Sequence, residues 1–287
     1  TLTGLKNVIF QIKGDNKATV SLTTVEEKNG HYHSWIGGTQ AGDITVSPIV
    51  GQQHMTTPQA SVHFIGDSAT ANVSQLEADK LSALADGQSP ITLTATVTDA
   101  HGNPVANVPV SFTTDSGVLS NSKVMSNSQG HATTQISNTR AVSATVSASA
   151  GTLSPDKQIA VTFTADTSTP TISALIADRE RAPANGVTPV TLSATVQDAN
   201  GNPLAGQKVL FTADSGTLNI TDALTDSRGV ARTLLTSLQA ETVSVTARTE
   251  TDTTGKTKAV RFIADNATAL VSQLEADRPE ATANGQS

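Results

Sequence analysis

The sequence of 287 residues contains no cysteine, which excludes disulfide bridges and thiolate metal sites. A chain without thiols suits a reducing compartment, and it suits equally a protein that crosses a membrane pore unfolded. Aromatic residues make up only 3% of the chain, with one Trp and one Tyr. Each hydrophobic core must therefore consist mainly of Val, Ala, Leu and Ile.

Long apolar runs and catalytic motifs are missing as well, and we expect no basic patch. The formal net charge is −7, so the chain as a whole does not have the positive charge that displaces counterions from nucleic-acid phosphates. No apolar run reaches the roughly 18 residues of a membrane-spanning helix. A Gly-x-Ser-x-Gly turn, a Walker loop and a His-Glu-x-x-His motif are all absent. We therefore expect no enzyme, no catalytic residues, no metal and no cofactor.

The sequence does contain a long internal repeat. Asp-Ala-His-Gly-Asn-Pro at 99–104 returns 99 residues later, at 198–203, as Asp-Ala-Asn-Gly-Asn-Pro. Asp-Ser-Gly at 115–117 returns at 214–216 with the same shift. Solenoid repeats have only about 20–50 residues, whereas a period near 100 matches an independently folding domain.

The repeat predicts two complete domains and two partial ones. The complete copies are residues 68–166 and 167–265. Residues 1–67 match the last two-thirds of a copy and form an N-terminally truncated, divergent domain, while residues 266–287 match only the opening strand of a further copy. We expect both ends to be cut from a longer chain.

An incomplete first domain and an unused opening strand together predict self-association. We expect residues 271–276 to donate a strand, head to tail, to the first domain of another molecule. The alternative is that residues 1–67 close into a smaller sandwich unaided.

Each complete copy has the pattern of a series of short strands. Apolar and polar residues alternate with a period of two in 91–97, 108–112, 132–136, 142–148 and 159–165, and we expect an opening strand around 73–78. Turn residues separate these segments, and none has a helical period. The pattern predicts an all-β fold of tandem immunoglobulin-like antiparallel β-sandwiches.

Phenylalanines take the place of the Cys–Trp–Cys group that fixes antibody domains. By alternation, two phenylalanines in each complete copy face inward. We expect them to form the structural core as two pairs, Phe112 with Phe163 and Phe211 with Phe262.

These motifs together resemble the group 1 bacterial Ig-like repeats of the intimin/invasin (inverse autotransporter) adhesins. The resemblance is carried by the strands joined by Asp-Ala-x-Gly-Asn-Pro, the Asp-Ser-Gly turn, the turn at 128–130 and the closing Val-x-Phe-x-Ala-Asp. It covers both complete copies well and residues 1–67 more loosely.

The resemblance implies an elongated extracellular rod at the bacterial cell surface, anchored in the outer membrane only through an N-terminal barrel outside these residues. Its implied function is that of an adhesin stalk attaching to host cells or matrix proteins, by presenting or contributing a binding surface. The alternative is a homotypic module for cell–cell aggregation or biofilm, with no host receptor.

The first domain carries the weak candidates for ligand binding. It holds four of the six His residues and the only Trp and Tyr. By register, Tyr32, Ser34 and Ile36 face inward, so His31, His33 and Trp35 share the outer face. Three interpretations of that face stay open: a contact with a partner, a transition-metal site, or an exposed strand surface without a ligand.

Carboxylates near the domain joints raise a calcium alternative, because hard cations prefer oxygen ligands. The competing interpretation is that they are solvated turn caps. The residues are Asp67 with Glu77 and Asp79, Asp166 with Asp178 and Glu180, and Asp265 with Glu275 and Asp277.

Overall fold

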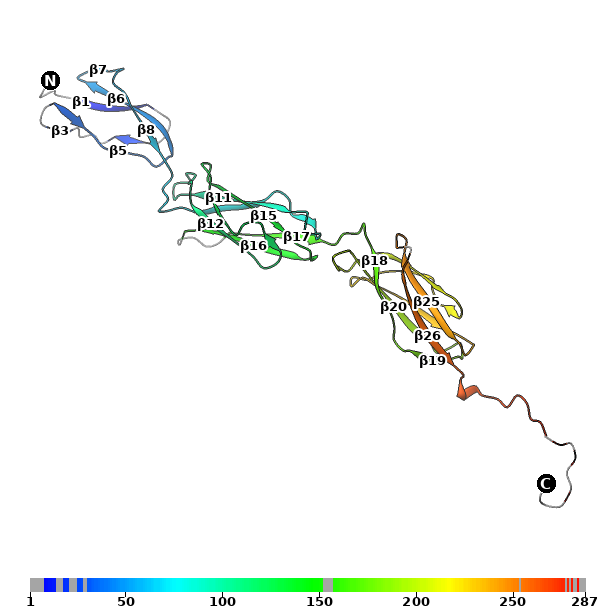
Figure 1. Cartoon of the computed structure of the whole chain (residues 1–287). Helices are drawn as coiled ribbons and strands as arrows, with labels where there is room; N and C mark the ends of the chain where they lie inside the picture. The colour runs from blue at the N-terminus through cyan, green and yellow to red at the C-terminus, as the bar shows by residue number, and fades with distance from the viewer. Residues whose placement is uncertain are drawn as a thin grey trace. The chain divides into compact units, whose positions relative to one another are not determined.

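The computed structural model describes residues 8–13, 18–20, 25–27, 30–151, 157–252 and 254–276, together with 278, 280 and 283. The chain divides into two compact units, residues 1–164 and 165–287. Strands dominate both units (Figure 1). None of the described residues belongs to a helix with the length and hydrophobicity needed to cross a membrane.

Residues 72–164 fold as two packed sheets. The strands are β9 (Asn72–Ala78), β10 (Ser82–Leu84), β11 (Ile91–Thr98), β12 (Pro109–Thr114), β13 (Val118–Leu119), β14 (Lys123–Met125), β15 (His131–Ser137), β16 (Ser143–Ala150) and β17 (Lys157–Thr164). One sheet has the order β13-β15-β11-β9 and the other β10-β17-β16-β12-β14. Neighbouring strands are antiparallel except β10, which runs parallel to β17.

Residues 171–263 repeat this arrangement strand for strand. The strands are β18 (Thr171–Ala177), β19 (Arg181–Pro183), β20 (Val190–Gln197), β21 (Lys208–Ala213), β22 (Thr217–Leu218), β23 (Asp222–Leu224), β24 (Val230–Thr236), β25 (Thr242–Thr249) and β26 (Lys256–Ile263). The sheet orders are β18-β20-β24-β22 and β19-β26-β25-β21-β23, with β19 parallel to β26. The predicted tandem β-sandwich fold is confirmed. The shortest strands of each copy, and the parallel edge pair, were not predicted.

Alternation of small apolar and hydroxyl residues explains why these segments are strands. In β11, Ile91, Leu93, Ala95 and Val97 are fully buried, and the threonines between them are half-buried on the opposite face. β20 repeats the pattern. Each strand therefore has one apolar face, which the opposite sheet covers.

The predicted phenylalanine pairs are wrong, although all four side chains are only 1–2% exposed. Phe112 on β12 lies opposite Ala148 of β16, whereas the neighbour of Phe163, Thr162 on β17, lies opposite Ser143. Both rings therefore belong to the same sheet, with β16 between them, and lie near opposite ends of β16. They occupy separate core clusters. Each ring fills one end of the core instead of joining the two sheets as a pair.

Phe211 and Phe262 have the same placement in the second copy, but there one continuous cluster contains both. Their strands, β21 and β26, are again separated by a strand of the same sheet, β25. The pairing fails here for the same topological reason.

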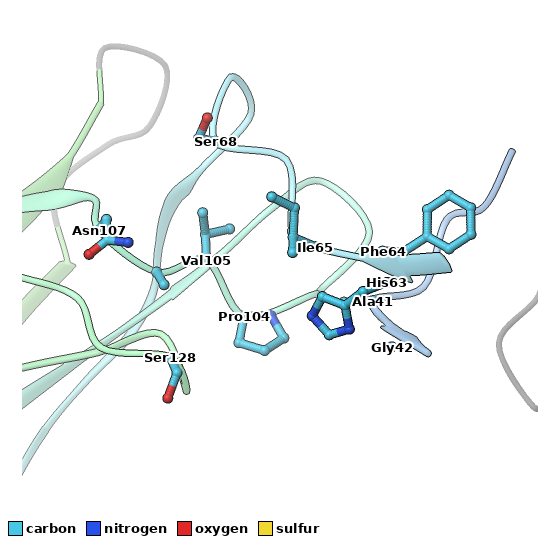
Figure 2. A pocket seen from close by; sticks show the side chains of 12 residues that line it. Ala41, Gly42, His63, Phe64, Ile65, Ser68, Pro104, Val105, Asn107 and Ser128 are labelled. Atoms are coloured by element: carbon cyan, nitrogen blue, oxygen red, sulfur yellow. The ribbon is translucent and has the colours of Figure 1, made fainter. Parts of the chain in front are cut away.

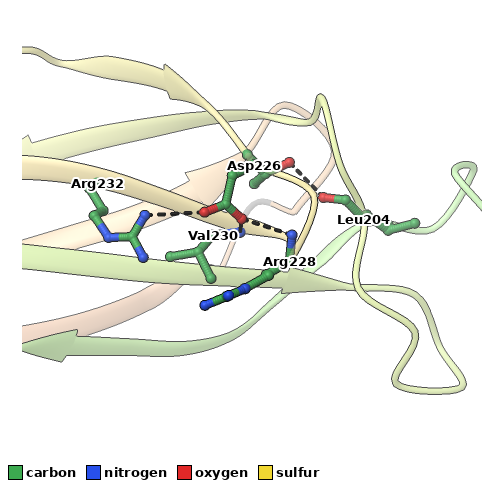
Figure 3. Close-up of polar contacts among 6 residues, drawn as sticks. Leu204, Asp226, Arg228, Val230 and Arg232 are labelled. Atoms are coloured by element: carbon green, nitrogen blue, oxygen red, sulfur yellow. Dashed lines mark hydrogen bonds and ion pairs between the residues drawn. The ribbon is translucent and has the colours of Figure 1, made fainter.

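Carboxylate-capped turns connect the strands. In the turn before β24, Asp226 Oδ1 accepts hydrogen bonds from the backbone N–H of Arg228 (2.9 Å) and Val230 (3.0 Å), and Oδ2 accepts one from Arg232 (3.2 Å) (Figure 3). Gly229 has φ +74°, and a Cβ there would lie 2.6 Å from the carbonyl oxygen of Val196. Only glycine fits this position.

The first domain is built differently from the repeats. Its main sheet contains β1 (Val8–Lys13), β6 (Gly42–Val50), β7 (Gln53–His54) and β8 (Ala60–Phe64), and two small sheets pair β2 (Thr19–Val20) with β5 (Ile36–Gly37) and β3 (Val25–Glu27) with β4 (His31–His33). The continuous strand expected across 31–36 is therefore wrong. It is divided into β4 and β5, because each half pairs with a different partner.

Residues 269–276 follow a short 3-10 helix, η1 (Asn266–Thr268), and form no strand. Val271 and Leu274 are 87% and 93% exposed, although their counterparts Ile172 and Leu175 in the preceding copy are buried. Strand donation by this segment stays a prediction.

We expect Phe211→Ala to destabilise residues 167–265 by about 3–5 kcal/mol, because it opens a cavity in a core that has few large side chains. Calorimetry of the full chain should show the transition of this domain lowered by about 10 °C or more. Leu224→Ala, at a side chain that is 67% exposed, is the control and should leave the transition unchanged. Equal transitions for the two variants would contradict the assigned core.

If the segment 271–276 donates a strand, the chain of 287 residues should associate in a concentration-dependent way. Leu274→Asp should abolish the association, since a charge in the acceptor core costs several kcal/mol. Light scattering measures this, and Val187→Asp is the matched control at a side chain that is 80% exposed. A parent chain that stays strictly monomeric at high concentration would contradict the prediction.

Candidate functional site

The first candidate site is the exposed surface around β4 in the first domain. The rings of His33 and Trp35 meet edge to face, with centroids 4.9 Å apart and an interplanar angle of 82°. Trp35 is 64% exposed, His31 is exposed and His33 is half-buried. The structure thus brings the rings of His33 and Trp35 together at the surface, with His31 two residues before His33 on the same strand.

The described side chains of this surface suggest a contact area. Among the residues that the structure describes, no group of three His, Cys, Asp or Glu side chains is placed to hold a metal ion. An indole held edge to face by an imidazole does provide a rigid, partly apolar contact area, and such aromatic residues often anchor protein interfaces. The arrangement suits contact with a partner better than metal binding.

A second candidate site is a pocket of about 550 Å³ inside the unit 1–164, where the first domain meets the second (Figure 2). His63 and Phe64 of β8 line one side, and Pro104 and Val105 line the other. His63 Nδ1 lies 2.7 Å from Oδ1 of Asp43, and both side chains are largely exposed. The pocket is shallow and mainly apolar, and it carries no catalytic constellation among the described residues.

The turn 99–104, whose Pro104 lines this pocket, connects the second domain to the first through hydrogen bonds. The Asn103 side chain donates to the carbonyl oxygen of Thr39 (2.9 Å), and its Oδ1 accepts from the backbone N–H of Ala41 (2.7 Å). Asp99 Oδ2 accepts from the backbone N–H of Asp67 at 3.0 Å. The Asp-Ala-x-Gly-Asn-Pro motif is therefore both a hairpin turn and the contact that attaches the first domain.

Asp99 itself is buried and saturated with donors. Burial opposes its charged form, but hydrogen bonds from the Asn103 side chain and from the backbone N–H groups of Asp67, Asn103 and His101 outweigh burial and lower the pKa of Asp99 to about 2. The carboxylate is consequently ionised at all physiological pH values. An ionised, immobile acceptor is well suited to hold backbone donors from two directions.

Asp198 in the second copy has the same hydrogen-bond pattern within residues 165–287. Asp198 Oδ2 accepts from the backbone N–H of Asp166 at 3.1 Å and from the Asn202 side chain at 2.9 Å. Burial again opposes the charge, and these hydrogen bonds lower the pKa of Asp198.

Sequence comparison assigns the repeats. Residues 73–165 and 172–263 each match the model of the bacterial Ig-like domain (group 1). The chain belongs to this family.

The Ig-like domains are similar to those of known adhesins. The chain is 33% identical over 231 residues to an inverse autotransporter adhesin of Escherichia coli K12. The aligned residues make up 78% of this chain and 10% of that protein. It is 35% identical over 195 residues to an intimin of Citrobacter freundii, covering 67% of this chain and 21% of that protein. The intimin/invasin resemblance is confirmed, and the chain spans only about 10–21% of the length of these relatives.

A solved structure shares the fold of the Ig-like domains. It is the Escherichia coli adhesin FdeC, with a TM-score of 0.55 and 20% identity, covering 91% of this chain and 87% of that chain.

The joint carboxylates proposed as calcium ligands act as caps in the Ig-like domains. Asp67 Oδ1 accepts from the backbone N–H of Ala69 (2.9 Å), and Asp79 Oδ1 accepts from that of Thr92 (2.8 Å). Asp277, a further candidate, lies outside the described residues. Glu180 instead pairs with Lys258 at 2.8 Å, and Glu77 accepts from the Gln75 side chain at 2.6 Å. Each described carboxylate of the set therefore has a partner within the chain.

We expect Asp99→Ala to destabilise the second domain by about 2–4 kcal/mol, because several buried N–H donors lose their acceptor. The folded pKa of Asp99 lies below the unfolded value of about 3.9, so its contribution is complete above that pH and disappears as the pH falls towards about 2. Denaturant unfolding at pH 7 and at pH 2.5 measures this, and the gap between parent and variant should shrink at the lower pH. Asp222→Ala, at an exposed position, is the control for the lost charge, and a gap that does not depend on pH would contradict the assignment.

Proposed function

We propose that the chain is an extracellular stalk segment of a bacterial surface adhesin that contributes to attachment to host cells or matrix proteins. The observation that carries the proposal is the tandem of Ig-like domains similar to those of intimin and an inverse autotransporter adhesin. The relatives are named as adhesins, so the chain's own role in attachment follows by analogy of domain type.

The structural role fits a stalk because the joint is held by specific hydrogen bonds. Asn103 binds the backbone of Thr39 and Ala41, and Asp99 binds that of Asp67. A joint fixed by a buried amide and a carboxylate transmits position better than a Gly/Ser-rich linker, whose ends move freely. Location outside the cell, with an anchor elsewhere in the full protein, is part of the same proposal.

Within the stalk, the surface of His31, His33 and Trp35 is the proposed contact with the partner. It combines an exposed indole with an adjoining imidazole ring, in the domain that departs most from the repeat. A protein receptor on the host cell or in its matrix is the partner class that such an aromatic anchor favours.

We expect Trp35→Ala to reduce binding of the purified chain to cultured cells or immobilised matrix proteins by about tenfold or more, as for a typical interface anchor. Leu238→Ala, at another large exposed side chain, is the matched control and should bind like the parent. Beads coated with the chain separate the two functions. Beads that aggregate with one another and ignore cells would favour the homotypic role, and unchanged binding by Trp35→Ala would remove this surface from the proposal.

A further inference from the structure

The outer face of the five-stranded sheet in residues 171–263 carries arginines in an unusual position. Arg181 of β19 and Arg261 of β26 are direct partners in the parallel register, and Thr242 of β25 is the next residue in the same row. All three are exposed, and the residue that follows each of them in its strand is buried. The two guanidinium groups therefore project from the same face of the sheet on neighbouring strands.

The carboxylates around this row are already engaged. They form three contacts: Glu180 with Lys258 at 2.8 Å, Asp178 with Arg179 at 3.4 Å, and Glu241 with the Ser237 hydroxyl at 2.9 Å. Within the described part of the chain, no carboxylate is paired with Arg181 or Arg261. Like charges side by side in register destabilise a sheet, so folding does not explain this pair.

The other copy shows that the fold does not need these arginines. The same row in residues 72–164 consists of Ser82, Thr162 and Ser143, joined in the same register. Nine of the 18 Lys and Arg residues lie in 167–265, but only four lie in 68–166. The two copies have the same strand order and differ in the charge of this face.

A second pair of cations lies at the other end of the same face. Arg248 is six residues beyond Thr242 on β25, a distance of about 20 Å along the strand, and Lys208 is exposed on neighbouring β21. Lys208 makes a 3.8 Å ion pair with exposed Glu250, which holds it weakly. Ser244 and Thr246, the outward residues of β25 between the two ends, are uncharged.

We propose that this face, defined by Arg181, Arg261, Arg248 and Lys208, binds an anionic polysaccharide that carries sulfate or carboxylate groups. A guanidinium matches either group in planar, two-point geometry. Cations at both ends of the face, with Ser244 and Thr246 between them on β25, suit a ligand whose charges repeat along its length. A folded protein partner usually needs an aromatic anchor, and the strands of this face carry none that points outward.

This inference rests on the proposed function only in that the ligand would be met outside the cell. It does not involve the surface of His31, His33 and Trp35. Loss of cell binding by Trp35→Ala and loss of polysaccharide binding are therefore separate results.

The test is binding of the full chain to heparin, used as the probe, at several salt concentrations. The double variant Arg181→Ser with Arg261→Thr takes the residues of the other copy, so it keeps a row that is known to fit the fold. It should weaken binding about tenfold or more and make the salt dependence shallower, since fewer counterions are released. The reciprocal change, Ser82→Arg with Thr162→Arg, should strengthen binding.

The matched control removes two other arginines of the same domain, Arg228→Gln with Arg232→Thr, again using the residues of the other copy. It has the same net charge as the first variant and should bind heparin like the parent. Equal losses in both variants would reduce the effect to net charge and overturn the proposal. If the parent chain does not bind heparin at physiological salt but binds an acidic polypeptide, the assignment of a polysaccharide as the ligand is overturned.

Discussion

One buried carboxylate in each repeat holds its turn and the preceding segment together. Asp99 caps its own turn by accepting from the backbone of His101 and Asn103, and the same side chain accepts from the backbone of Asp67. Its environment lowers the pKa of the carboxyl to about 2, so the acceptor never loses its charge under ordinary conditions. Oδ1 of Asp99 serves the turn and Oδ2 serves the preceding segment, so one carboxylate supports both.

The core of each domain is built mainly from small side chains. Small aliphatic side chains on alternating positions pack two sheets without disulfides and with only two phenylalanines per repeat. Such a core depends on completeness of packing more than on any single large residue, and each phenylalanine closes one end. That distribution explains why the two rings do not need to touch.

The sequence predicts the strands well and the contacts between strands poorly. Alternation of apolar and hydroxyl residues suffices to find β11 or β20, because each strand has one buried face. The pairing of Phe112 with Phe163 could not be judged from spacing, since it depends on strand order and both residues belong to one sheet. The joint role of Asn103 was also hidden, because its partners are the backbone groups of Thr39 and Ala41, which carry no residue-specific signal.

The surface of His31, His33 and Trp35 illustrates a different limit. Composition alone identified these residues, but the strand that was expected to align all three is divided between β4 and β5. What keeps the rings of His33 and Trp35 together is their direct edge-to-face contact, a local feature that alternation does not encode. The candidate site could therefore be found from rarity of residue type, and its geometry could not.

Two repeats with the same fold provide an internal comparison that a single domain lacks. Where the two copies differ at a position, the shared fold does not demand one particular side chain there. Arg181 and Arg261 occupy the positions of Ser82 and Thr162 with the same strand register. Conserved cores and turns keep the domains interchangeable as structural units, and their outer faces remain free to acquire different partners. The physical division between a fixed interior and a variable face allows a repeated Ig-like domain to present different side chains without a change of fold.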